Sequence, residues 1–104
     1  MIQMIKSIFR KGPETNLGEL INNGATILDV RTPEEFKSGH LRGAVNIPLR
    51  QLNSSLSNIK KDKPVITCCA SGMRSNSAKN MLLSSGFTEV YNGGGWMNLK
   101  RYVK

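Results

Sequence analysis

Four short, mostly apolar segments alternate along the chain with segments whose apolar residues recur at helical spacing. The short segments are typical of strands and cover residues 26–30, 44–47, 65–68 and 89–91. Helices are predicted to start near Asn16, Thr32, Pro48, Arg74 and Trp96. Strands that alternate with helices predict an α/β fold, with a central parallel sheet and helices on both faces.

Local signals mark where these elements begin and end. The capping box Thr-Pro-Glu-Glu at residues 32–35 predicts a brief helix that stops at Gly39. Pro48 opens a helix that carries leucines at helical spacing, and Gly86 ends the helix that follows the two cysteines. Residues 92–95 contain three consecutive glycines and are predicted to form a loop.

The length of 104 residues fits one domain, since ~100–200 residues per domain is usual. We expect the domain to cover residues 15–104, after an N-terminal extension of residues 1–14. The N-terminal segment lacks the apolar core of a secretory signal, and no apolar run reaches membrane-spanning length. A cytoplasmic location with reduced thiols is therefore expected.

The chain is basic, with 15 Lys and Arg against 7 Asp and Glu. The basic residues are scattered and are not interleaved with aromatics, so neither nucleic acid nor a membrane is expected as a partner. A positive field that attracts small anions is the favoured interpretation. With one histidine, His40, and two adjacent cysteines, a zinc cluster is not plausible, and no metal or cofactor is expected.

The segment after the third predicted strand carries the reactive residue types. Cys69 follows this strand, and its loop contains Gly72 and ends at Arg74, where a helix begins. Ligands of parallel sheets bind beyond the carboxyl ends of the strands. Backbone N–H groups of a tight loop, a helix N-terminus and an arginine all favour a thiolate. We therefore expect a lowered pKa of Cys69 and an anionic substrate at this loop.

Several motifs in the same order resemble the rhodanese family. The loop matches the pattern Cys-x-x-Gly-x-Arg. Residues 28–36, Leu-Asp-Val-Arg-Thr-Pro-Glu-Glu-Phe, and residues 40–48, His-Leu-Arg-Gly-Ala-Val-Asn-Ile-Pro, resemble the two upstream signatures of the family. Residues 91–96 resemble its C-terminal glycine turn, here with an extra glycine. The resemblance spans about residues 15–103 and implies a rhodanese-like fold.

The resemblance implies a sulfurtransferase that carries sulfane sulfur as a persulfide on Cys69. The implied donor is thiosulfate or a persulfide, and the implied acceptor is cyanide or a thiol, such as a small thiol or a thioredoxin-like protein. Substrate binding is expected from the loop residues Ala70, Ser71, Gly72, Met73 and Arg74. Ser75 is expected to start the following helix and to have a more structural role.

The loop departs from many family members in its charge. Ala70 and Met73 stand where many of them carry a basic residue, so Arg74 is the one charged residue of this loop. The departure puts efficient use of thiosulfate in question and favours a thiol or persulfide partner.

Two alternatives to this interpretation are a different enzyme and a non-enzyme. Five residues separate Cys68 from Arg74, which is the spacing of arsenate reductases and of cysteine phosphatases, some of which share the rhodanese fold. However, Cys68 completes the strand, so its side chain should point away from the pocket, and Thr67 stands where phosphatases have His. A non-catalytic rhodanese-like binding module is the other alternative, against which the intact Cys69 loop argues.

Other residues invite a catalytic role but are expected to be framework. Asp29 and Arg31 are expected to form a hydrogen-bonded pair, with Arg31 also a candidate for a positive rim. His40 is expected to be structural. Trp96 fits either the core or a pocket wall, and the glycines at residues 93–95 fit a turn that passes close to the active loop.

Overall fold

The computed structural model describes residues 16–103, in which four parallel strands form one sheet in the order β2-β1-β3-β4. The strands are β1 (Thr26–Asp29), β2 (Val45–Asn46), β3 (Val65–Cys69) and β4 (Val90–Gly95). The α-helices are α2 (Leu17–Asn22), α3 (Pro33–Lys37) and α4 (Met73–Ser84), and the 3₁₀ helices are η1 (Leu49–Ser54), η2 (Leu56–Asn58) and η3 (Trp96–Tyr102). The expected extension, residues 1–14, lies outside the described residues.

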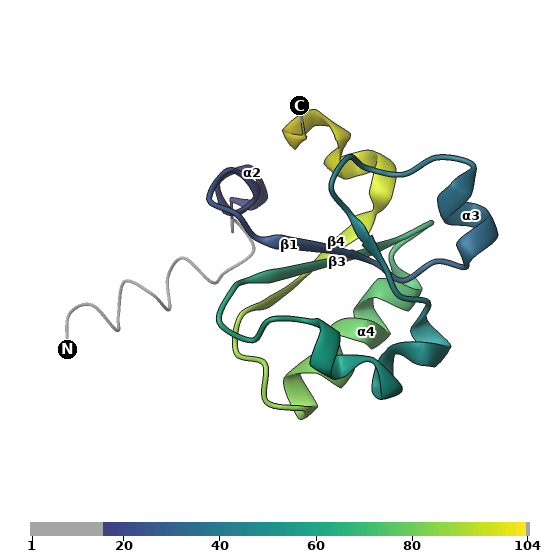
Figure 1. The fold of residues 1–104 in the computed structure, drawn as a ribbon. Helices are drawn as coiled ribbons and strands as arrows, with labels where there is room; N and C mark the ends of the chain where they lie inside the picture. Colours follow the sequence, from purple (N-terminus) through teal and green to yellow (C-terminus); the bar gives the residue numbers. More distant parts are fainter. Residues whose placement is uncertain (1–15, 104) are drawn as a thin grey trace.

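Helical segments cover both faces of the sheet, as predicted (Figure 1). On one face α4, η1 and η2 enclose a core that includes Leu28, Leu52 and Leu82. On the other face α2 and η3 enclose a smaller core that includes Ile27 and Ile66. Successive side chains of a strand point to opposite faces, so neighbouring residues of β1 and β3 enter different cores.

Local sequence signals place the helices that precede and follow β1. The Asn16 side chain accepts a hydrogen bond from the Glu19 N–H at 3.0 Å and caps α2. At α3 the Thr32 hydroxyl accepts from the Glu35 N–H at 3.2 Å, while the Glu35 carboxylate accepts from the Thr32 N–H at 2.9 Å. This reciprocal pair confirms the predicted capping box. None of the helices described combines the length and apolar character needed to span a membrane.

The segment after Pro48 forms two short 3₁₀ helices, η1 and η2, instead of one continuous helix. Leu49 and Leu52 are three residues apart, which suits the three-residue turn of a 3₁₀ helix, and both pack on the core. The Ser54 hydroxyl donates to the Gln51 carbonyl at 3.0 Å. Such side-chain bonds compete with regular backbone bonding, which is consistent with the early end of η1.

The predicted loop at residues 92–95 is wrong, because β4 continues through it to Gly95. Asn92 pairs with Thr67 and Gly95 pairs with Cys69, with a register shift between them. A Cβ on Gly93 would lie 2.8 Å from the Thr67 carbonyl oxygen, and one on Gly95 would lie 2.9 Å from the Ala70 carbonyl oxygen. These glycines therefore allow β4 to approach β3 and the following loop closely.

Candidate active site

β3 ends in two adjacent cysteines whose side chains enter opposite cores. Both are buried, at 0% exposure for Cys68 and 1% for Cys69. Cys69 lies in the core beneath α4, and Cys68 lies in the core on the other face. Burial, followed by the nearby Asp29 carboxylate, raises the pKa of Cys68 to about 12. Cys68 therefore faces away from the loop, as predicted, and the five-residue phosphatase spacing does not correspond to a site.

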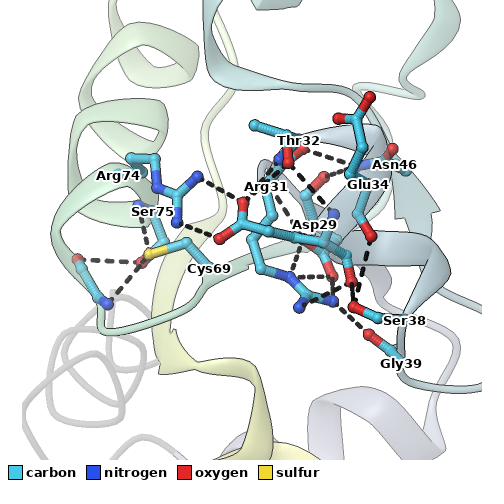
Figure 2. Close-up of polar contacts among 12 residues, drawn as sticks. Asp29, Arg31, Thr32, Glu34, Ser38, Gly39, Asn46, Cys69, Arg74 and Ser75 are labelled. Carbon is cyan, nitrogen blue, oxygen red and sulfur yellow. Dashed lines mark hydrogen bonds and ion pairs between the residues drawn. The ribbon is translucent and has the colours of Figure 1, made fainter.

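The Cys69 sulfur is surrounded by donors from the loop and from the first turn of α4. The Gly72 N–H donates to Sγ at 3.0 Å and the Ser75 N–H donates to it at 3.3 Å. The Ser75 hydroxyl lies 3.5 Å from Sγ, and Figure 2 shows the sulfur of Cys69 beside Ser75. Two backbone donors and one hydroxyl thus converge on a single sulfur atom.

This arrangement favours the thiolate of Cys69. Burial alone raises the pKa of Cys69, but the Ser75 hydroxyl and the N–H groups of Ser75, Gly72 and Ser71 outweigh it, so the net pKa is lowered. The direction agrees with the expectation from the sequence. Because the thiolate is the nucleophilic form of cysteine, the site can support covalent chemistry on sulfur.

The loop depends on Gly72 for its shape. Gly72 is the N-cap of α4 and has a φ of +110°, a conformation that side chains rarely adopt. A Cβ at this position would also lie 3.5 Å from the Gly94 Cα. Ala70, Ser71 and Met73 are exposed, Met73 at 79%. Their side chains point to solvent, so backbone groups line the inner surface of the loop.

Ser75 has closer contact with the sulfur than the sequence indicated. It is fully buried in the first turn of α4, and its hydroxyl also lies 3.0 Å from the Gly72 carbonyl oxygen and 2.6 Å from Asn92 Oδ1. The expectation of a mainly structural Ser75 therefore needs correction. The sequence gives no indication of the role of Asn92, because its pattern predicts a loop at residues 92–95. The glycines that follow Asn92 are the one feature of the sequence that indicates a close approach of β4 to β3.

Arg74, which is predicted to bind the anionic donor, forms an ion pair with Glu35. Its guanidinium donates to the two carboxylate oxygens at 2.8 and 3.1 Å, and in Figure 2 the Arg74 side chain extends from α4 toward Arg31 and Thr32. The hydrogen bonds from Arg74, followed by the Thr32 N–H, lower the pKa of Glu35 to about 2. The charge of Arg74 is therefore balanced by a carboxylate of α3. Because β1 and β3 are neighbours in the sheet, the helices that follow them, α3 and α4, begin close together. The order of the strands is therefore the signal that indicates this pair.

Asp29 and Arg31 form the expected framework pair. Arg31 Nη2 lies 2.8 Å from Asp29 Oδ2 and 2.7 Å from the Gly39 carbonyl oxygen, and the guanidinium lies 4.6 Å from the centre of the Trp96 ring. Arg31 is only 4% exposed, so it does not contribute to a positive rim. Trp96 packs against Arg31 and belongs to the core on the Cys68 face. This contact favours the core interpretation of Trp96 over a pocket wall.

His40 packs against Phe36 near the end of α3. Its Nδ1 lies 2.7 Å from the Phe36 carbonyl oxygen, and its ring stacks on the Phe36 ring at 3.7 Å between centroids. These contacts give His40 a structural role, as expected. Within residues 16–103, no group of three or more His, Cys, Asp or Glu residues could hold a metal ion.

Comparisons with known proteins agree with the geometry. The model of the rhodanese-like domain family matches residues 14–101. The thiosulfate sulfurtransferase GlpE of Ectopseudomonas mendocina is 34% identical over 95 residues, which cover 91% of this chain and 87% of that protein. The protein YqhL of Bacillus subtilis is 47% identical over 68 residues, which cover 65% of this chain but only 54% of YqhL.

A solved structure of a rhodanese with anions from E. coli superposes on this chain with a TM-score of 0.68 at 34% identity. The superposition covers 72% of this chain and 91% of that one.

Proposed function

This chain belongs to the rhodanese-like domain family, and we propose that it is a sulfurtransferase that carries sulfane sulfur as a persulfide on Cys69. The observation that carries the proposal is the convergence of the Gly72 and Ser75 N–H groups on the Cys69 sulfur. GlpE, which aligns over most of this chain, is a thiosulfate sulfurtransferase. Thiosulfate is therefore the first donor to test.

In the first step the Cys69 thiolate attacks the outer sulfur of thiosulfate. A new S–S bond forms to Cys69, the S–S bond of thiosulfate breaks, and sulfite leaves with the electron pair. The outer sulfur of the persulfide then lies at the loop of residues 70–74. Backbone N–H groups of Ala70, Ser71, Gly72, Met73 and Arg74, together with the N-terminus of α4, stabilise its negative charge.

In the second step an acceptor removes that outer sulfur. A thiolate or cyanide attacks it, the persulfide S–S bond breaks, and Cys69 is regenerated as a thiolate that the Gly72 and Ser75 donors stabilise. The product is an acceptor persulfide or thiocyanate. A small thiol or the thiol of a thioredoxin-like protein suits this step.

The pairing of Arg74 with Glu35 bears on the choice of donor. With this guanidinium balanced, a dianion such as thiosulfate depends on backbone dipoles of the loop for much of its binding. A persulfide donor carries less charge and depends less on a free cation. We propose that the site accepts both donors and uses a persulfide more efficiently than thiosulfate.

Mass spectrometry of the protein after thiosulfate treatment tests the function. A gain of one sulfur atom that cyanide reverses is expected, with the adduct on Cys69. Cys69→Ser should abolish the adduct and thiocyanate formation, whereas Cys68→Ser should retain most of both. Loss of the adduct in Cys68→Ser but not in Cys69→Ser would contradict the proposal, as would turnover of p-nitrophenyl phosphate without thiocyanate formation.

A further inference from the structure

The Ser75 hydroxyl lies close to three groups that can accept its single proton. It lies 3.5 Å from the Cys69 sulfur and 2.6 Å from Asn92 Oδ1, and the Gly72 carbonyl oxygen is a third neighbour at 3.0 Å. A serine hydroxyl can donate one hydrogen bond and accept others. Its contact with the sulfur therefore depends on which neighbour receives the proton.

The main chain of Ser75 is held in place while its hydroxyl can rotate. Its N–H donates to Cys69 Sγ, and its carbonyl oxygen accepts from the buried Thr67 hydroxyl at 2.8 Å. Rotation about the C–O bond moves only the proton. The hydroxyl can thus change its partner without any movement of the active loop.

The Asn92 carboxamide has a defined orientation. Its Oδ1 accepts from the Gly94 N–H at 2.9 Å, and its Nδ2 lies 3.4 Å from the Gly72 carbonyl oxygen. Exchanging the oxygen and nitrogen would place two donors, or two acceptors, against each other. The atom that faces the Ser75 hydroxyl is therefore an acceptor, to which Ser75 can donate.

We propose that Asn92 is a positioning residue that acts on Cys69 through Ser75. When Cys69 is a neutral thiol, its S–H donates to Ser75 Oγ and the Ser75 hydroxyl donates to Asn92. When Cys69 is a thiolate, the hydroxyl rotates to donate to the sulfur, and Asn92 keeps the Gly94 N–H. Asn92 thus competes with the thiolate for one proton and moderates its stabilisation.

This inference concerns the same thiol as the proposed sulfur transfer and rests on its identification as Cys69. The charged and titratable groups around that thiol stay the same when Asn92 is replaced by alanine. They are Cys68 on β3, Arg74 on α4 and Glu35, the partner of Arg74, on α3. A change caused by replacing Asn92 would therefore not come from a lost charge.

The test is the pH dependence of Cys69 alkylation by iodoacetamide in the full chain, with the adduct located by mass spectrometry. Asn92→Ala should lower the midpoint by about half a pH unit, the effect of a modest hydrogen bond on a thiolate. Asn98→Ala, at an exposed asparagine of η3, is the matched control and should leave the midpoint unchanged.

The same measurement in a Ser75→Ala background tests whether Asn92 acts on Cys69 through Ser75. Ser75→Ala should itself raise the midpoint, and Asn92→Ala should then have no further effect. An equal shift with and without Ser75, or a higher midpoint in Asn92→Ala alone, would overturn the proposal. If Ser75→Ala does not fold, a midpoint that is lowered in Asn92→Ala but unchanged in Asn98→Ala still supports the proposal, and a midpoint that Asn92→Ala leaves unchanged or raises overturns it. Alkylation needs no sulfur donor, so its outcome is separate from that of sulfur transfer.

Discussion

Glu35 and Arg74 are joined by two parallel hydrogen bonds, with Nη1 to Oε1 at 2.8 Å and Nη2 to Oε2 at 3.1 Å. The pair links the first turn of α3, after β1, to the first turn of α4, after β3. It ties the active loop to the neighbouring helix with the bidentate geometry that arginine and carboxylate favour. It also balances the one charged side chain of residues 69–74.

Glu35→Gln should improve the use of thiosulfate. The amide retains an oxygen that can accept from the Thr32 N–H, but it no longer balances Arg74. We expect the KM for thiosulfate to fall several-fold at low ionic strength and the effect to shrink as salt is added. Steady-state thiocyanate formation measures this. Glu34→Gln, at the exposed neighbour, makes the same change in net charge and should have a smaller effect; equal effects would show that only net charge matters.

The same pair should make stability depend on pH in the acid range. The pKa of Glu35 is lowered from 4.5 to about 2, so its contribution is fully present above pH 4.5 and is lost as the pH falls through about 2. Both side chains are more than one third exposed, so the contribution is at most about 1 kcal/mol. Urea unfolding of the wild type and Glu35→Gln should differ most above pH 4.5. A gap that widens on acidification would contradict this assignment.

Gly93→Ala should destabilise the fold through a clash at the sheet. A methyl group there would lie 2.8 Å from Ile66 Cγ2 and from the Thr67 carbonyl oxygen, which belongs to the sheet backbone and cannot readily move. Overpacking of this kind costs about 1–3 kcal/mol, and we expect the upper part of that range in urea unfolding. Gly94→Ala meets no atom within 4 Å but has a φ of +79°, so it should cost less, about 1 kcal/mol. Equal losses would exclude the clash as the cause.

Arg31→Met should be among the most destabilising substitutions. It removes the guanidinium that pairs with Asp29, a carboxylate with 0% exposure, and a buried pair broken in this way costs about 3–5 kcal/mol. Thermal and urea unfolding measure the loss. His40→Ala removes an exposed side chain and should cost less than about 1 kcal/mol. If Arg31→Met lowers the stability only slightly, and lowers it by the same amount in an Asp29→Asn background, the pair is not a structural element.

Features encoded locally could be predicted from the sequence. The capping box at residues 32–35 depends on four adjacent residues, and the opposite orientations of Cys68 and Cys69 follow from the alternation of a strand. The pattern Cys-x-x-Gly-x-Arg likewise predicts the tight loop around Gly72.

Features that depend on distant segments could not be predicted. Glu35 and Arg74 are 39 positions apart, and their pairing requires the order of the strands in the sheet. The glycines of β4 suggest a turn until their close contacts with β3 are known. Asn92 reaches Ser75 only because β4 continues along β3 to the level of Cys69.

The opposite orientation of the two cysteines has a consequence for oxidative damage. Many reactive cysteines are protected by a second thiol of the same chain, which converts a sulfenic acid to a disulfide before further oxidation. This chain has two cysteines, and Cys68 is buried in the core behind the strand. A sulfenic acid on Cys69 therefore has no internal resolving thiol. Its rescue depends on a thiol from solution, so the acceptor that unloads sulfur would also be suited to keep the enzyme reduced.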